Sequence, residues 1–448
     1  MTPSIVAHLL SLRDLFFGPI YILIVFLIVR KWKRKNYVNS PLKQFIYPAL
    51  FFRLAGCIML SFLYNFYYGY GDTFGYFTGA QETWNAFVSH PKLAWEIIFS
   101  SAQDYSSEVQ QIAGEMAYTG FSASSVAMLK ISSVVGLLSF GTYLPIAILY
   151  SLLSFWGTWM IYVVFTKLYP HLYKQLAVGI LFVPSVVIWS TGIMKEPLCI
   201  FGLGLCFYSF YNLLKREKVF RHILFFLLGA SILLNIKDYI FYSFATGVIL
   251  WSYSAFTNNI DSLILRILSK VIIIIVFIIC AVLFINTGLI NEKITGTLSN
   301  AETLQNAMTI ANESSGGSSY TITSEGDFSF GGLLKSFFLS LNVSLFRPYL
   351  WECKSVLMFM NFFESFITTI LVILLFFKAG FRKIFSYTAT SPVLLFSIVF
   401  SILMAVMAGF ISYNFGTLIR YKTPFLPFFF SYIVIILYDK PVARKQVY

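Results

Sequence analysis

Several side chains that could transfer a proton or bind a charged ligand lie where long apolar runs end. They are Asp72, Lys195, Glu196, Lys237, Asp238, Arg347, Glu352, Arg420 and Tyr421. A carboxylate in such a place can take a proton from a hydroxyl group within hydrogen-bond reach. Lysine and arginine can bind a phosphate or pyrophosphate group, and arginine does so with two parallel hydrogen bonds. The set therefore suits reactions on phosphate-bearing molecules, and it equally suits binding and transport of an anion.

Each of these residues also has a structural interpretation. Asp72 begins a polar stretch and can cap a helix. The pair Lys195–Glu196 can belong to a capped hairpin, and the pair Lys237–Asp238 can be an ordinary pair of charges at a helix end. Arg347 and Arg420 can be anchors at a membrane surface. Both interpretations of each site remain open from the sequence alone.

The composition is that of an integral membrane protein. Hydrophobic residues make up 58% of the 448 residues and charged residues 11%, whereas a soluble domain has about 25% charged residues. The net charge of +13 indicates basic flanks on the cytoplasmic side of the spans. Nucleic-acid binding is not expected, because no basic stretch alternates with a soluble aromatic surface.

The cysteines and histidines predict neither a metal site nor a disulfide framework. The five cysteines are scattered, mostly in apolar runs, and the four histidines show no ligand spacing. No cofactor is evident, and a divalent metal stays an open alternative. No cleavable signal peptide is expected, because Asp14 precedes the first apolar run and a basic cluster follows it.

The apolar runs predict an all-α, polytopic transmembrane bundle with about eleven spans, since a span needs about 20 mainly apolar residues. We expect one integral membrane domain over residues 1–448. The expected spans lie near 15–30, 45–68, 143–166, 176–193, 197–213, 220–236, 239–256, 271–289, 356–378, 393–412 and 424–438. The apolar stretch 126–142 can be re-entrant or interfacial instead. Arg53 lies within a span, where we expect it to pair inside the bundle or to extend to the surface.

The basic clusters orient these spans. Under the positive-inside rule they belong in the cytoplasm, and the expected spans place all of them on one side. The N-terminus is then outside and the C-terminus inside, with two long outer loops at 69–142 and 290–355. Aromatic amphipathic stretches in the first loop suit helices that lie at the membrane interface. The Gly/Ser-rich segment 312–319 makes the second loop a linker or a lid.

Three short segments resemble the GT-C glycosyltransferases, membrane enzymes that use polyprenyl-phosphate sugars on the outer face. Asp72 with Tyr76 resembles the acid and the downstream aromatic residue of that family's first outer loop. Lys195-Glu196-Pro197-Leu198, in the segment from Ser190 to Leu205, resembles the family's hairpin between two spans. Arg420-Tyr421, followed by two prolines, resembles the entrance to its last hydrophobic segment. The chain departs from the family in having an extra crossing before the acidic loop and a single strongly placed acid in that loop.

The resemblance implies a membrane glycosyltransferase that moves a sugar from a polyprenyl-phosphate donor to a glycan, lipid or protein acceptor. Asp72 would be the general base or position the acceptor, and Glu196 would orient Lys195 or the acceptor. The implied substrate-binding residues are Tyr76, Lys195, Arg347, Glu352, Arg420 and Tyr421. The expected location is a bacterial inner membrane, with the active site facing outward among membrane lipids, in the synthesis of cell-envelope polysaccharide.

Three other classes remain as alternatives. Membrane polysaccharide polymerases also use an outer Asp-x-x-x-Tyr element and outer arginines, so an oligosaccharide repeat-unit polymerase is the nearest competitor. A polysaccharide or lipid transporter and a non-catalytic membrane component are the others. The placement of the charges on one face favours transfer, since a transporter exposes polar groups near the bilayer midplane. The absence of an internal repeat also weakens the transporter interpretation.

Overall fold

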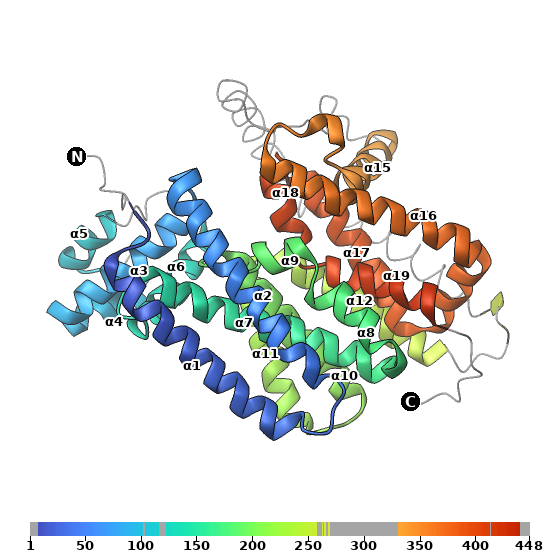
Figure 1. The fold of residues 1–448 in the computed structure, drawn as a ribbon, viewed down its shortest axis with the longest axis horizontal. Helices are drawn as coiled ribbons and strands as arrows, with labels where there is room; N and C mark the ends of the chain where they lie inside the picture. Colours follow the sequence, from blue (N-terminus) through green and yellow to red (C-terminus); the bar gives the residue numbers. More distant parts are fainter. Residues whose placement is uncertain are drawn as a thin grey trace. The chain divides into compact units, whose positions relative to one another are not determined.

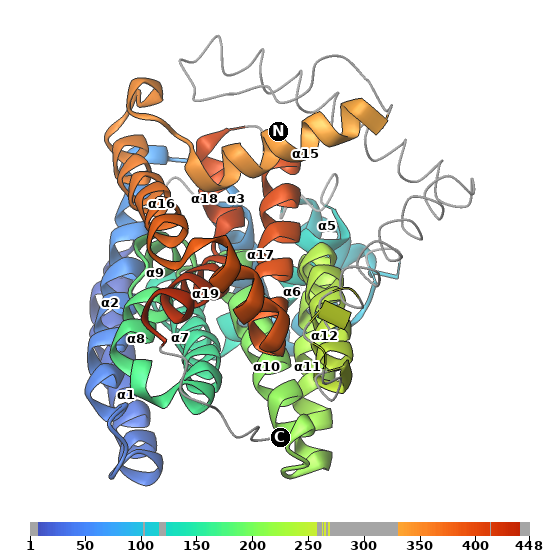
Figure 2. The same cartoon turned by 90° about the vertical axis from the view of Figure 1, so that its right-hand side faces the viewer.

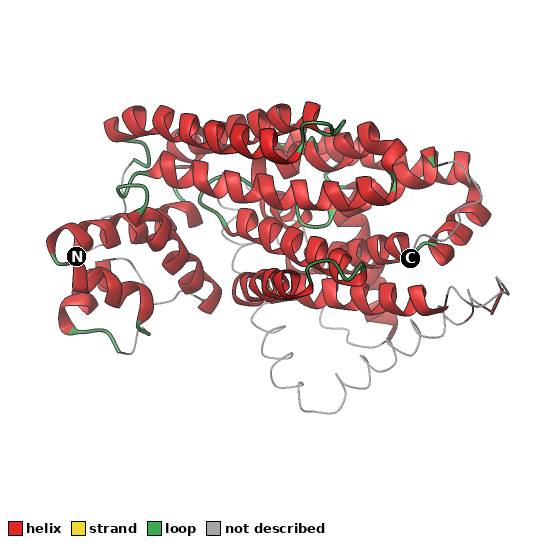
Figure 3. Ribbon diagram, turned by 90° about the horizontal axis from the view of Figure 1, so that it is seen from below, coloured by secondary structure: helices red, strands yellow, loops and turns green. Residues whose placement is uncertain are grey.

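A computed structural model describes residues 8–101, 104–115, 122–257, 262, 264–265, 268, 330–412 and 414–439. These residues form helices joined by short turns, and no strand occurs among them (Figure 3). The chain divides into two compact units, with the boundary after Phe241. Each unit is described separately.

The first unit contains the helices before residue 237 (Figure 1). They are α1 (Leu12–Asn36), α2 (Lys43–Phe62), the π-helical turn η1 (Leu63–Tyr68), α3 (Asp72–Ser89), α4 (Pro91–Phe99), α5 (Ser107–Glu115), α6 (Ala123–Leu137), α7 (Tyr143–Leu168), the 3-10 turn η2 (Pro170–Leu172), α8 (Tyr173–Leu181), α9 (Pro184–Trp189), α10 (Lys195–Leu214) and α11 (Val219–Ile236).

The second unit contains the remaining helices, and α12 begins just before its boundary. They are α12 (Asp238–Thr257), α15 (Phe330–Phe346), the 3-10 turn η3 (Leu350–Glu352), α16 (Val356–Thr390), α17 (Pro392–Ile411), α18 (Phe415–Lys422) and α19 (Leu426–Tyr438). Here α17 packs against α15 and α19. The rings of Phe396 and Phe400 in α17 pack against the ring of Phe428 in α19.

The expectation of a polytopic helical bundle is confirmed. Seven described helices are long and apolar enough to cross a membrane, and the number is eight if α18 and α19, bent by 62°, form one broken span. The segment expected to span at 176–193 is broken into α8 and α9, because the residue before Pro184 disfavours helical geometry. Helix α12 covers the span expected at 239–256 but is not among the seven. The span expected at 271–289 lies outside the described residues.

The helices of the first unit have one basic end and one end that carries the candidate chemical groups. Basic residues occupy the last turns of α1 and α7, and they fill the turn between α10 and α11. Figure 2 shows that turn and the end of α1 at the bottom. Asp72, Lys195 and Lys237 lie at the opposite ends of α2, α10 and α11. The segregation expected from the sequence is therefore present within this unit.

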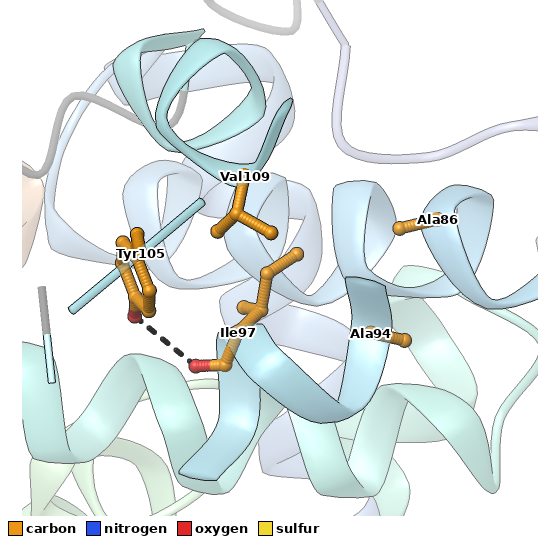
Figure 4. Close-up of a cluster of buried hydrophobic side chains, with 5 residues drawn as sticks. All are labelled: Ala86, Ala94, Ile97, Tyr105 and Val109. Carbon is orange, nitrogen blue, oxygen red and sulfur yellow. Dashed lines mark hydrogen bonds between the residues drawn. The ribbon is translucent and has the colours of Figure 1, made fainter. Parts of the chain in front are cut away.

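The described residues of the expected loop at 69–142 form a small helical layer made of α3 to α6. Its core is formed by Ala86, Ala94, Ile97, Tyr105 and Val109 (Figure 4). The Tyr105 hydroxyl donates a hydrogen bond to the Ile97 carbonyl oxygen, 3.1 Å away. Of the expected loop at 290–355, residues 290–329 lie outside the described part, and the next residues form helix α15.

Glycines let α10 pack closely against two neighbours. A Cβ atom at Gly204 would lie 2.7 Å from the Gly157 Cα of α7. A Cβ atom at Gly202 would lie 3.0 Å from the Gly229 carbonyl oxygen of α11. Such small residues allow membrane helices to approach at backbone distance. Helix α10 is therefore held between α7 and α11, and its first turn is the centre of the candidate site.

Candidate functional site

Helix ends from four parts of the sequence meet around Lys195, the first residue of α10. Its ammonium group donates hydrogen bonds to the hydroxyls of Ser124 and Ser125, over 2.9 and 3.1 Å, in the first turn of α6. It also lies within electrostatic range of Lys237, Asp72 and Glu196. Lys195 is half-buried. The first turns of α3, α6 and α10 and the end of α11 thus converge on one cation.

Glu196 and Lys237 form a buried ion pair beside this cation. The Glu196 Oε1 and Lys237 Nζ atoms are 2.9 Å apart. The exposed fraction of the side chain is 0% for Glu196 and 8% for Lys237. Glu196 belongs to the first turn of α10, and Lys237 directly follows α11. The pair therefore connects these two helices at their candidate-site ends. In this arrangement Glu196 supports the site from inside and has no surface for a substrate.

Asp72 is exposed and begins α3. Two glycines with positive φ, Gly69 at 67° and Gly71 at 127°, turn the chain from η1 into this helix. Residues with a Cβ rarely adopt that geometry, so the glycines set the direction from which Asp72 emerges. Tyr76 lies one turn later and is buried in the core. The aromatic residue that the sequence assigned to substrate binding therefore packs inside the unit.

The exposed carboxylate of Asp72 and the half-buried ammonium group of Lys195 lie at the same end of this unit, where apolar helices begin or end. The carboxylate of Asp72 is suited to accept a proton from a hydroxyl group. The ammonium of Lys195, together with the positive first turns of α6 and α10, is suited to a negatively charged group. Because the Lys237 charge is compensated by Glu196, Lys195 is the cation of this cluster that a ligand can reach.

The other predicted site residues gather within the second unit. The guanidinium of Arg347 contacts the Glu352 carboxylate through two nitrogens: Nε lies 2.9 and 3.1 Å from the two carboxylate oxygens, and Nη2 contacts Oε1. Glu352 also accepts a hydrogen bond from the Tyr349 backbone N–H over 2.8 Å. Arg347 lies over the ring of Phe415, 5.4 Å from its centroid. This guanidinium is thus already engaged by a carboxylate, which competes with the expected phosphate contact.

Helix α18 places Lys422 next to Arg347. The Lys422 ammonium donates to the Arg347 carbonyl oxygen over 3.0 Å, and the Ser365 hydroxyl donates to that oxygen over 2.8 Å. Arg420 and Tyr421 lie on the same helix and are half-buried. The sequence motif around these two residues therefore includes a third residue, Lys422, that fixes the backbone at Arg347.

Several residues of these clusters were missed at the level of sequence. The sequence offers Lys237 only a neighbouring Asp238 as a partner, whereas the structure pairs it with Glu196 across two helices. Ser124, Ser125 and Lys422 were not singled out. The available signal was weak: each lies next to an apolar run, but contact with Lys195 or Arg347 depends on how the helices pack.

Metal ligands and thiols are two further kinds of group that could take part in chemistry. No group of three or more His, Cys, Asp or Glu side chains in that part of the chain is arranged to hold a metal ion. Cys353 follows Glu352 in the turn before α16. Burial, and secondarily the Glu352 carboxylate, raises the pKa of its thiol. A thiol with a raised pKa is a poor nucleophile at neutral pH.

Comparison with known proteins gives no relative. No protein-family model matches the chain, and no curated protein and no solved structure matches it. The candidate site therefore has to be interpreted from its own geometry.

Proposed function

We propose that this protein is a membrane glycosyltransferase. It transfers a sugar from a polyprenyl-phosphate donor to a glycan, lipid or protein acceptor on the extracytoplasmic face of a bacterial inner membrane. The observation that supports the proposal most is the convergence of Asp72 and Lys195 at one end of the first unit. Five helices of this unit are long and apolar enough to cross a membrane, and the basic clusters lie at their other end.

The proposed reaction is a displacement at the anomeric carbon of the donor sugar. The acceptor hydroxyl oxygen forms a bond to that carbon, and Asp72 takes the hydroxyl proton. The bond from the anomeric carbon to the phosphate oxygen breaks, and the polyprenyl phosphate leaves with the bonding electrons. Lys195 stabilises the charge that develops on this leaving group. The lipid tail of the donor stays in the bilayer beside the helices.

The roles of the other residues follow from their contacts. Glu196 and Lys237 join α10 to α11 and keep Lys195 at the surface of the cluster. In the second unit, Glu352 orients the guanidinium of Arg347.

The test is a reaction with purified protein and a polyprenyl-phosphate monosaccharide. A glycosyltransferase releases polyprenyl phosphate when an acceptor is added, without a nucleotide sugar, because the donor already carries the activated bond. Elongation of polyprenyl-pyrophosphate oligosaccharides, with this donor untouched, would instead indicate a polymerase. Solute movement into sealed vesicles without donor turnover would indicate a transporter. Either of these two results would refute the proposal.

A further inference from the structure

Arg53 carries a positive charge in the interior of span α2, and only 1% of its surface is exposed. An ionised residue at such a position is costly in a membrane and usually has a partner or a role. Arginine stays protonated in proteins, so neutralisation does not remove the cost. The reason for its presence lies in the groups around it.

The Arg53 guanidinium connects α7 to the end of α9 through neutral oxygens. On the α7 side, Nη1 donates to the Ser154 hydroxyl over 2.6 Å, and Nη2 donates to the Thr158 hydroxyl over 3.3 Å. On the α9 side, Nη1 donates to the Val186 carbonyl oxygen over 2.9 Å and to the Ser190 hydroxyl. The hydroxyl oxygens of Ser154 and Ser190 are hydrogen-bonded to each other, 2.9 Å apart.

The end of α9 needs such donors. This helix has six residues, and its last carbonyl groups have no partner within the helix. Irregular backbone at membrane depth is tolerated where protein groups satisfy it. The Arg53 guanidinium and the Ser190 hydroxyl both donate to the Val186 carbonyl oxygen. Gly56, one turn later on α2, allows close approach. A Cβ atom at Gly56 would lie 2.8 Å from the Val187 carbonyl oxygen.

The segment held by Arg53 leads directly to the candidate site. Ser190 follows α9, and the turn that begins there ends at Met194, next to Lys195. Gly192 in this turn has a φ of 75°, and its N–H donates to the Ser151 hydroxyl of α7 over 3.4 Å. The turn is therefore attached to α7 at Gly192 and at Ser190, and at Ser190 the Arg53 guanidinium adds to the direct hydrogen bond between the Ser154 and Ser190 hydroxyls.

We propose that Arg53 is a positioning residue for the Lys195–Glu196 turn. It fixes the broken end of α9 against α7 and thereby sets where α10 begins. The planar guanidinium suits this role, because its donors point in several fixed directions and reach two helices at once. The role in catalysis rests on the proposed function, whereas the structural role does not.

The test uses thiol accessibility and needs no substrate. In a chain without its native cysteines, one reporter cysteine replaces Met194, which is buried beside Lys195. A second reporter in a separate chain replaces Leu203, which is buried further along α10. Arg53→Met should accelerate labelling at 194 by a membrane-permeant maleimide by about tenfold, as expected for lost hydrogen bonds to a charged group. Labelling at 203 should stay unchanged.

Two further variants refine the result. Arg53→Lys retains the charge but not the planar guanidinium, so the reporter at 194 should be labelled at an intermediate rate. Arg221→Met removes an exposed arginine of α11, and the reporter at 194 should then be labelled as fast as in the parent. If Arg53→Met does not reach the membrane, Ser190→Ala replaces it and should accelerate labelling at 194 by a few-fold. An unchanged rate at 194, or equal acceleration at 194 and 203, would overturn the positioning role.

The transfer assay separates this inference from the proposed function. If the parent protein has transferase activity, Arg53→Met should lower kcat more than it raises the KM for the donor, and Arg53→Lys should restore part of kcat. If the parent has none, the proposed function fails while the labelling result still decides the role of Arg53.

Discussion

At the scale of single residues, the candidate site has a clear division between groups at the surface and groups inside. Asp72 is exposed and Lys195 is half-buried, whereas Glu196 and Lys237 are buried against each other. Only the first two are accessible to a ligand in this arrangement. Substitutions at the surface should therefore change activity, and substitutions inside should first change stability.

Replacement of Asp72 tests the general base. Asp72→Asn keeps the size of the side chain but cannot accept the proton, so the rate of transfer should fall by about 10²-fold or more. Asp238→Asn is the matched control, because Asp238 is an exposed carboxylate that begins α12; its activity should stay near the parent value. Transfer by Asp72→Asn within a few-fold of the parent would leave Asp72 only as an acidic residue in the first turn of α3.

Replacement of Lys195 tests the phosphate contact. Lys195→Ala removes the accessible cation of the cluster, so the KM for the polyprenyl-phosphate donor should rise by about tenfold or more. The KM for the acceptor should change much less. Lys92→Ala, at an exposed lysine of α4, should leave both constants unchanged. Equal effects on donor and acceptor would contradict a specific contact with the donor phosphate.

The buried pair of Glu196 and Lys237 should behave as a stability element. Lys237→Met leaves the Glu196 carboxylate inside the protein without its ammonium group, which costs about 3–5 kcal/mol. The double variant with Glu196→Met as well removes both charges and should recover most of this loss. Thermal unfolding in detergent measures the difference. A double variant as unstable as the single one would show that the charge left behind is not the cause.

At the scale of elements, the position of α10 is set by close packing of backbone on backbone. The glycines of α7, α10 and α11 face one another at distances that leave no room for a side chain. By contrast, α1 and α11 are largely exposed along their apolar windows, as expected of helices that contact lipid. The site is therefore attached to a helix that close backbone packing holds against two neighbours.

Substitution of Gly204 tests this packing. Gly204→Val places atoms against the Gly157 backbone, which cannot move aside as a flexible side chain would. The resulting separation of α7 and α10 should lower stability by about 1–3 kcal/mol. Leu227→Ala, at an exposed position of α11, is the control and should change the unfolding temperature little. A Gly204→Val protein as stable as the parent would mean that the two helices separate without cost.

At the scale of the whole molecule, the main expectation is the direction in which the chain crosses the membrane. Cysteines that replace Asp72, Asp238 or Arg420 should react with an impermeant thiol reagent added from outside. Cysteines that replace Arg216 or Arg382 should react only after permeabilisation, because basic clusters stay in the cytoplasm. Position 238 is used rather than 196, since Glu196 is buried. Outside labelling at 216 with none at 72 would invert the topology and remove the proposed outer site.

The sequence by itself determined that the chain is a helical membrane protein. Hydropathy sums over neighbouring residues, so long apolar runs reveal spans without knowledge of the tertiary structure. The same local information places Asp72, Lys195 and Glu196 at helix ends, next to turns that contain glycine or proline. Local sequence also identifies the basic clusters that orient the spans.

Only the tertiary structure decided which of these groups meet. The pairing of Glu196 with Lys237, and the contact of Lys195 with the serines of α6, depend on how helices are rotated and packed. The buried state of Tyr76 and the acceptors around Arg53 depend on the same packing. Helix rotation places a residue toward lipid or toward the interior, and apolar residues suit both surroundings. For that reason the apolar pattern of this chain predicts where its helices lie along the sequence but not which of their faces come together.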